Sequence, residues 1–168
     1  ELPGAKEVCV EFNTLSKSHN MAGWRVAALM GNAETIKALY TLKTNFDSGH
    51  FRPVMDAAVA AMTGDQTWLQ ARNETYRQRR DVVIQTLHRL GLQADIPCAS
   101  LYVWFSVPPG QTSIDFTARM LDRAHVSLSP GSVFGSAGEG YIRLSLTAPN
   151  ERIEEAMLRL EKNSVNIL

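Results

Sequence analysis

The most informative segment of the chain is TLSKSHNMAGWR, at residues 14–25. Two hydroxyl side chains precede Lys17, Thr14 by three residues and Ser16 by one, and the segment ends with Arg25. Hydroxyl groups and a planar guanidinium are good ligands for phosphate. A lysine amine beside such ligands indicates a cofactor that carries both an aldehyde and a phosphate. The alternative interpretation is a solvated lysine in a polar loop.

Two short apolar runs flank this segment. Residues 8–12 are β-branched and apolar and have the length of a buried strand. Residues 26–30 are too short for a helix and end at a Gly-Asn turn, so a second strand is expected there. The polar residues 13–25 are expected to form a loop. Lys17 would then be held at the end of a strand, where α/β folds place their sites.

Helical patterns follow the second strand. Residues 33–44 carry apolar side chains near a 3.6-residue spacing, and residues 54–62 predict a small, apolar helix that is buried. A longer helix is expected from Asp65, which can serve as its N-cap, to Leu90, where Gly91 ends it. Such a helix would be roughly 39 Å long at 1.5 Å per residue. That length is typical of a helix that bridges two packing units.

The last third of the chain alternates strands with helices, which predicts an α/β fold. The expected strands are residues 101–105, 126–128 and 141–146. The expected helix N-caps are Ser113 and Asn150. The apolar helix faces are expected to be Ile114, Leu121 and Ala124 in the first helix and Ile153, Met157 and Leu160 in the second.

Composition excludes several classes of protein. The chain has 168 residues, enough for one domain, or one domain with a fragment of another, and its 45% apolar content is enough for a core. Lys+Arg and Asp+Glu number 17 each, so the zero net charge argues against a nucleic-acid or anionic-membrane partner. No apolar run reaches membrane-span length. Two cysteines, Cys9 and Cys98, are too few for a disulfide framework or a zinc site and favour a reducing, cytoplasmic location.

The lysine segment resembles a known family. Ser/Thr-x-Ser-Lys followed by Gly-Trp-Arg is similar to the pyridoxal-phosphate lysine motif of fold-type I aminotransferases of class I/II. Three further motifs fall in that family's order and approximate spacing: Asn45-x-Asp47-Ser48-Gly49-x-Phe51, Pro130-Gly131-x-x-Phe134-Gly135 and Tyr141-x-Arg143-Leu144-Ser145. The resemblance covers nearly the whole chain. The Asn-x-Asp-Ser-Gly motif is most similar to the LL-diaminopimelate and alanine aminotransferase branch.

The resemblance assigns roles within the segment. Lys17 would be the catalytic lysine that binds pyridoxal 5'-phosphate covalently, and Thr14, Ser16 and Arg25 would hold the cofactor phosphate. The family commonly has Ser at the position of Thr14, and the hydroxyl is kept. It commonly has an aromatic residue at the position of His19, which we interpret as a variable loop residue.

The resemblance also implies two substrate-binding residues. Strand alternation puts Ile142, Leu144 and Leu146 on one face and Arg143 on the other. An arginine on a solvated strand would show the same pattern, but the resemblance implies that Arg143 binds the substrate α-carboxylate. Asn45 lies in an expected loop that, in the family, reaches the active site of the neighbouring subunit. A simple turn between two helices is an equally good interpretation of that loop.

The implied activity is a pyridoxal-phosphate-dependent aminotransferase, which moves an amino group between an L-amino acid and a 2-oxo acid by a ping-pong mechanism and acts as a homodimer. One alternative is another fold-type I enzyme with the same lysine and arginine, such as a carbon–sulfur lyase or a cyclopropane-forming synthase. The other is a non-catalytic fragment that acts as a scaffold.

The family places this lysine well past the middle of its sequence, so the chain resembles a C-terminal portion. The expected domains are residues 1–62, the tail of the large-domain sheet, residues 63–90, the connecting helix, and residues 91–168, the small α/β domain. The strand after Lys17 would return antiparallel to the strand before it. The open edges of these strands predict association or loss of order in the first 60 residues, and the chain alone is expected to be inactive.

Overall fold

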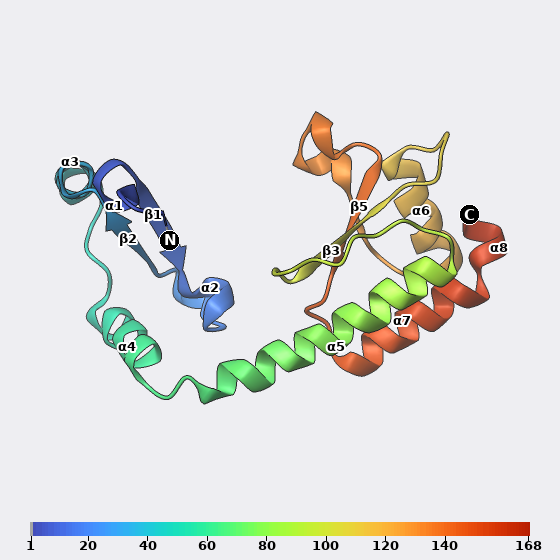
Figure 1. Cartoon of the computed structure of the whole chain (residues 1–168), viewed down its shortest axis with the longest axis horizontal. Helices are drawn as coiled ribbons and strands as arrows, with labels where there is room; N and C mark the ends of the chain where they lie inside the picture. The colour runs from blue at the N-terminus through green and yellow to red at the C-terminus, as the bar shows by residue number, and fades with distance from the viewer. Residues whose placement is uncertain (1) are drawn as a thin grey trace. The chain divides into compact units, whose positions relative to one another are not determined.

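The computed structural model describes residues 2–168, and Glu1 lies outside the described part. The chain divides into two compact units, with the boundary between Gln66 and Thr67. Each unit combines helices with strands, which confirms the expected α/β class (Figure 1).

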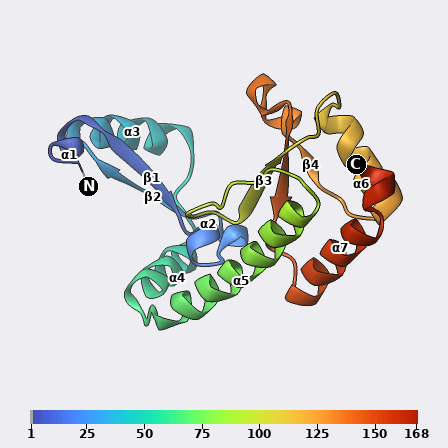
Figure 2. The same ribbon diagram turned by 45° about the vertical axis from the view of Figure 1, so that its right-hand side comes forward.

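The first unit is built on a two-stranded hairpin, and α3 lies along that hairpin (Figure 2). Its elements are α1 (Ala5–Val8), β1 (Val10–Thr14), α2 (Leu15–Ser18), the 3-10 helix η1 (Ala22–Trp24), β2 (Ala27–Gly31), α3 (Ala33–Phe46) and α4 (Arg52–Thr63). The strands pair antiparallel, from Val10 opposite Gly31 to Thr14 opposite Ala27. This confirms the expected antiparallel return.

Two expectations for this unit are wrong. Strand β1 begins two residues later than predicted and is not buried, with Phe12 72% exposed. A hairpin of two strands has no second layer over its open face, so its apolar side chains stay in contact with solvent. Helix α4 begins with Pro53 in its first turn as expected, but Ala58 is its one buried residue.

The small core of the first unit forms around the lysine segment. Its buried side chains are Leu15, Met21, Val26 and Ala58. Leu15 and Met21 belong to residues 14–25, Val26 follows directly, and Ala58 comes from α4. The segment with Lys17 is therefore the best-packed part of this unit.

An apolar groove of about 580 Å³ lies between the hairpin and α3. Its lining residues are Phe12, Ala27, Ala28, Leu29, Ile36, Leu39, Tyr40, Leu42, Lys43, Phe46 and Asp47. Tyr40 is 67% exposed and Phe46 88% exposed. The helical pattern predicted for residues 33–44 is correct. Of its apolar side chains, Ile36 and Leu39 are half-buried, and Tyr40 and Leu42 are exposed.

The second unit is a three-stranded antiparallel sheet with helices packed against it (Figure 1). Its elements are α5 (Thr67–Arg89), β3 (Tyr102–Ser106), α6 (Ser113–Ala124), β4 (Ser129–Pro130), the 3-10 helices η2 (Gly131–Phe134) and η3 (Ser136–Gly138), β5 (Tyr141–Ser145), α7 (Asn150–Lys162) and α8 (Ser164–Ile167). The strand order is β3-β5-β4, so β5 is central.

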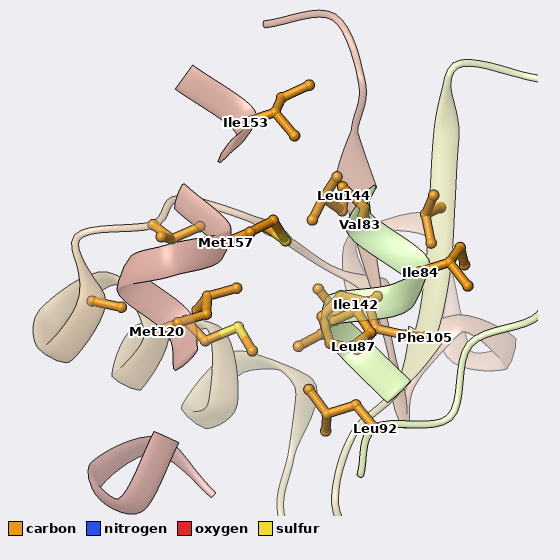
Figure 3. Close-up of a cluster of buried hydrophobic side chains, with 14 of the residues drawn as sticks. Val83, Ile84, Leu87, Leu92, Phe105, Met120, Ile142, Leu144, Ile153 and Met157 are labelled. Carbon is orange, nitrogen blue, oxygen red and sulfur yellow. The ribbon is translucent and has the colours of Figure 1, made fainter. Parts of the chain in front are cut away.

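The core of this unit is formed by side chains from the sheet and from the helices α5, α6 and α7 (Figure 3). Leu87 of α5 and Ile142 of β5 are fully buried, and Phe105 of β3 is 1% exposed. Met120 of α6 and Met157 of α7 complete the cluster from the other helices. The expected apolar face of α7, with Ile153, Met157 and Leu160, is confirmed.

Several boundaries and faces differ from expectation in the second unit. Helix α5 begins at Thr67 rather than Asp65. The expected strand at residues 126–128 is irregular, and the short strand β4 follows it. The N-cap of α6 is Thr112, one residue before Ser113, and that of α7 is Pro149, one residue before Asn150.

The expected apolar face of α6 is also wrong. Ile114 and Leu121 are 58% and 52% exposed, while Phe116 and Met120 are fully buried and only Ala124 of the expected face is buried. The sheet lies against the Phe116–Met120 side, because the largest apolar side chains gain most from burial.

None of the helices in residues 2–168 combines the length and apolar character that a membrane crossing requires. Within the same residues, no cluster of three His, Cys, Asp or Glu side chains could hold a metal ion. Cys9 and Cys98 are both exposed free thiols.

Candidate functional site

A single turn of helix presents Lys17 directly after β1. Thr14 ends the strand in an extended conformation (φ −108°, ψ 140°) and caps α2, its hydroxyl oxygen accepting from the Ser16 backbone N–H at 3.1 Å. A threonine N-cap stabilises a helix by about 1 kcal/mol. The predicted loop at residues 13–25 is therefore partly wrong, since it contains this turn and the 3-10 helix η1.

Two hydroxyl groups lie together beside this turn. The Thr14 and Ser16 hydroxyl oxygens are 2.9 Å apart. The Thr14 hydroxyl also lies 3.3 Å from the Val26 carbonyl oxygen, and the Leu15 N–H donates to that same carbonyl. The hairpin thus brings the two ends of the segment together, with Thr14 next to the residue that follows Arg25.

Arg25 has an unusual backbone conformation. Its φ of 53° and ψ of 44° lie in the left-handed region, and its side chain donates to the Ala22 carbonyl oxygen at 3.1 Å. For a residue other than glycine this conformation costs roughly 1–2 kcal/mol. Local strain of this kind is concentrated at functional sites, which makes Arg25 a candidate ligand for an anion.

Lys17 is exposed on a backbone that is anchored on both sides. Leu15 before it and Met21 after it are 6% and 8% exposed, and the Met21 N–H donates to the Leu15 carbonyl oxygen at 3.2 Å. The backbone of Lys17 is therefore held in a fixed position, with its side chain at the surface. This is the arrangement that a nucleophilic lysine needs, since it must reach a ligand without moving its backbone.

His19 connects this turn to the end of the first unit, which the sequence did not reveal. Its Nδ1 lies 2.9 Å from the Ser18 hydroxyl and its Nε2 3.2 Å from Gln66 Oε1. The Gln66 amide donates to the Ala61 and Gly64 carbonyl oxygens, each at 2.8 Å. No local pattern predicts a bond between residues 47 positions apart.

The second unit carries a guanidinium between two aromatic rings. The Arg143 Cζ lies 4.1 Å from the ring centroid of Tyr102 and 4.2 Å from that of Phe134. Within residues 2–168 Arg143 has ring contacts but no hydrogen bond or ion pair. Its five N–H donors are therefore available at the edge of the stack, which suits bidentate binding of a carboxylate.

The alternation predicted around Arg143 is confirmed. Ile142 and Leu144 are buried, while Arg143 is half-buried on the opposite face. Trp104 is the cross-strand partner of Arg143, and its ring meets that of Phe134 edge-on at 5.4 Å and 73°. The sequence did not identify Tyr102 as a partner of Arg143, although the strand period puts Tyr102 and Trp104 on one face.

Asn45 does not lie in the expected loop. It belongs to the last turn of α3, where its side-chain amide donates to the Thr41 carbonyl oxygen at 2.7 Å, and the loop begins only at Asp47. The Lys43–Asp47 ion pair, at 2.6 Å, closes the helix end. Asn45 is exposed, and its role in substrate binding stays a prediction.

The chain thus holds two groups of candidate residues, one in each unit. The first unit contributes an amine, two adjacent hydroxyl groups and a strained arginine, which together suit an aldehyde with a phosphate. The second unit contributes the Arg143 guanidinium, whose Cζ lies within 4.2 Å of two aromatic ring centroids and which suits a carboxylate.

Comparisons with known proteins identify the family of this chain. Residues 3–160 match the model of the family described as aminotransferase class I and II, and the chain belongs to this family. It is 48% identical over 160 residues to LL-diaminopimelate aminotransferase of Oleidesulfovibrio alaskensis, covering 95% of this chain and 41% of that protein. It is 46% identical over 161 residues to LL-diaminopimelate aminotransferase 2 of a Nostoc species, covering 96% and 41%.

The structure is also similar to solved aminotransferases. An aminotransferase from Staphylococcus aureus matches with a TM-score of 0.91 and 30% identity, covering 99% of this chain and 44% of that one. The chain spans about two fifths of the length of the relatives it matches and corresponds to a C-terminal portion of them.

Proposed function

We propose that this chain is the C-terminal portion of a pyridoxal-phosphate-dependent aminotransferase that moves an amino group between an L-amino acid and a 2-oxo acid. The observation that carries the proposal is the turn at the end of β1, where Lys17 is presented beside the adjacent Thr14 and Ser16 hydroxyl groups. The relatives named as LL-diaminopimelate aminotransferases support amino transfer over the carbon–sulfur lyase, cyclopropane-forming synthase and scaffold alternatives.

The residues of the first unit fit one end of the cofactor. A phosphate group needs several hydrogen-bond donors and a compensating charge, which Thr14, Ser16 and Arg25 can supply. Lys17 supplies the primary amine that an aldehyde requires. Pyridoxal phosphate, when bound, supplies the electron sink for chemistry at the substrate α-carbon, and the protein supplies binding and orientation.

Lys17 is proposed to act twice. Its Nζ would hold the aldehyde end of the cofactor. As a free amine, the same group would move a proton at the substrate α-carbon as a general acid–base. Because the backbone of Lys17 is anchored by Leu15 and Met21, the amine can do this without a movement of α2.

Arg143 is proposed to orient the substrate. Its in-plane N–H donors can bind both oxygens of an α-carboxylate, while Tyr102 and Phe134 prevent the guanidinium plane from tilting. A carboxylate held at two points fixes the α-carbon with respect to the rest of the site, which is where most of the gain from orientation arises. Asn45 is proposed as a further substrate contact.

The named relatives narrow the substrate class. Two of them are LL-diaminopimelate aminotransferases, which favours an amino acid with a second charged end and a role in amino acid biosynthesis. We further propose a homodimer in the cytoplasm, without nucleic-acid or membrane partners. The domain assignment of residues 1–62, 63–90 and 91–168 is proposed as well, supported by a division of contacts close to the first boundary.

Reductive trapping tests the lysine. The chain is incubated with pyridoxal phosphate, reduced with borohydride and mapped by peptide mass spectrometry. One dominant adduct at Lys17, absent from Lys17→Ala, is the expected result. Lys43→Ala is the matched control, because Lys43 is exposed and already paired with Asp47. Labelling spread over all surface lysines would favour the scaffold alternative.

A second assay tests the reaction class in a full-length protein that contains this portion. Transfer of an amino group that depends on a 2-oxo acid is expected, and Lys17→Ala should abolish it. Elimination from a sulfur-containing amino acid without any need for an oxo acid would instead favour the lyase alternative.

A further inference from the structure

The loop between β4 and β5 folds back on itself. A Cβ added at Gly131 would lie 1.9 Å from the Gly138 carbonyl oxygen and 2.6 Å from that of Tyr141. The two ends of the loop are therefore in direct backbone contact, and only glycine fits at Gly131 and Gly138. This contact closes the loop, and the Gly140 carbonyl oxygen accepts a hydrogen bond from the Val107 N–H at 2.8 Å, which holds the end of the loop beside β3.

Phe134 is carried by this loop and is weakly fixed by its own burial. It is 47% exposed, so the ring is in contact with solvent over nearly half its surface. It nevertheless covers one face of the Arg143 guanidinium and meets the edge of Trp104. The position of the ring must therefore depend on what holds the loop.

A polar cluster attaches the loop to α6. The Glu139 carboxylate accepts two hydrogen bonds from one residue, at 2.7 Å from the Ser113 N–H and at 2.8 Å from its hydroxyl. The Ser113 and Ser132 hydroxyl oxygens are 3.2 Å apart, and the Ser132 N–H lies 3.4 Å from the Ser113 hydroxyl. Ser113 is fully buried, so this attachment point is rigid.

We propose that Glu139 is a positioning residue for carboxylate binding at Arg143. Through Ser113 and Ser132 it fixes the loop, and the loop holds Phe134 against the guanidinium. The inference rests on the proposed role of Arg143. A guanidinium confined between two rings has already lost the freedom that binding would otherwise remove, so its affinity for a small carboxylate is higher than that of a mobile arginine.

The attachment to Ser113 requires a side chain with two acceptor oxygens at residue 139. Ser113 offers an N–H and an O–H in nearly the same direction, and a carboxylate can accept both. Glutamine keeps one acceptor oxygen and so should keep part of the attachment, whereas alanine keeps none. Glu139→Gln and Glu139→Ala therefore form a graded pair.

The test uses the full 168-residue chain labelled with ¹⁵N, with the Arg143 Nε–Hε signal assigned by its loss in Arg143→Lys. Two quantities are measured. The first is the change in the chemical shift of that signal that the two aromatic rings cause in the absence of ligand. The second is the dissociation constant for acetate and for pyruvate.

Glu139→Ala should reduce the ring-induced displacement and weaken carboxylate binding about three- to tenfold, the range expected when one long side chain loses its pre-organisation. Glu139→Gln should lie between this variant and the wild type. Glu154→Ala, which removes the same charge from an exposed position on α7, should change neither quantity. Methyl signals of Met120 and Met157 report whether the core stays folded in each variant.

The outcomes separate the two proposals. If the wild-type chain binds acetate and Glu139→Ala binds it equally well with an unchanged Arg143 signal, the positioning role is overturned and the carboxylate role stands. If the wild-type Arg143 signal is displaced by the rings but responds to neither acetate nor pyruvate, the carboxylate role fails and the inference fails with it. If Glu139→Ala unfolds, the Glu139→Gln result decides the positioning role.

Discussion

The candidate functional groups of the two units are supported by hydrophobic cores of very different size. In the second, Arg143 lies on the central strand of a sheet whose other face is fully buried against α5, α6 and α7. In the first, Lys17 lies beside a buried cluster of four residues, and much of the apolar surface of β1, β2 and α3 is open. A polar site can therefore be well formed locally while the surrounding fold lacks a complete core.

The largest expected effect is a difference in hydrogen exchange between the two sheets. Amides of β3 and β5 should exchange only through unfolding of the second unit, whereas those of the β1–β2 hairpin should exchange at least about a hundredfold faster, since an isolated hairpin is marginally stable. Exchange measured by mass spectrometry on the intact chain tests this. Equal protection in both sheets at low protein concentration would contradict the comparison. Protection that rises with concentration would instead indicate the expected association.

The second largest expected effect is a difference in the stability lost when a leucine is truncated in each unit. Leu87→Ala removes a fully buried side chain and should lower the free energy of unfolding by about 2–5 kcal/mol. The matched change Leu42→Ala removes a side chain that is 61% exposed and should cost less than about 0.5 kcal/mol. Urea unfolding followed by far-UV circular dichroism measures both. Similar losses would mean that the groove is covered in solution.

The glycine contact predicts a smaller loss that is confined to one loop. Gly131→Ala places a Cβ against the Gly138 carbonyl oxygen and should destabilise the second unit by about 1–3 kcal/mol, the usual cost of overpacking. Gly49→Ala, where an added Cβ meets nothing within 4 Å, is the control and should be close to neutral. Thermal unfolding of the two variants side by side checks this, and a neutral Gly131→Ala would refute the backbone contact.

The smallest expected effect is a dependence of the second unit on pH. Hydrogen bonds from the Ser113 N–H and then from its hydroxyl hold the pKa of the Glu139 carboxyl below its usual value, against a smaller opposing effect of desolvation. The folded-state pKa is therefore lower than the unfolded one, so the stabilisation is complete above the unfolded value and is lost as the pH falls through the folded value. Glu139→Gln should flatten this part of the curve of unfolding free energy against pH. An unchanged curve would show that the cluster is not coupled to folding.

The sequence predicted several local features that depend on the spacing of side chains along one strand or helix. Alternation at residues 141–146 gave the correct faces for Ile142 and Arg143, and the spacing of Ile153 and Met157 gave the correct face of α7. The lysine segment was recognised because its hydroxyl groups and arginine lie close together in sequence. These features are decided within a few residues of the side chain concerned.

Features that depend on tertiary contacts were missed. Helix α5 begins two residues later than expected, and the Gln66 side chain just before it donates to carbonyl oxygens of residues 61 and 64. Phe12 was expected to be buried, but burial requires a covering layer that a hairpin does not possess. The stack of Tyr102 and Phe134 on Arg143 joins three separate parts of the second unit, and no short pattern encodes it.

The left-handed backbone of Arg25 has a consequence for how variants of this protein would be selected. Glycine adopts that conformation without cost, so Arg25→Gly would relax the turn while it removes a proposed phosphate ligand. A library screened only for heat tolerance or solubility would therefore be enriched in chains without the arginine. A screen for cofactor retention would keep the arginine. The two screens together would show whether stability is lowered at this position in favour of cofactor binding.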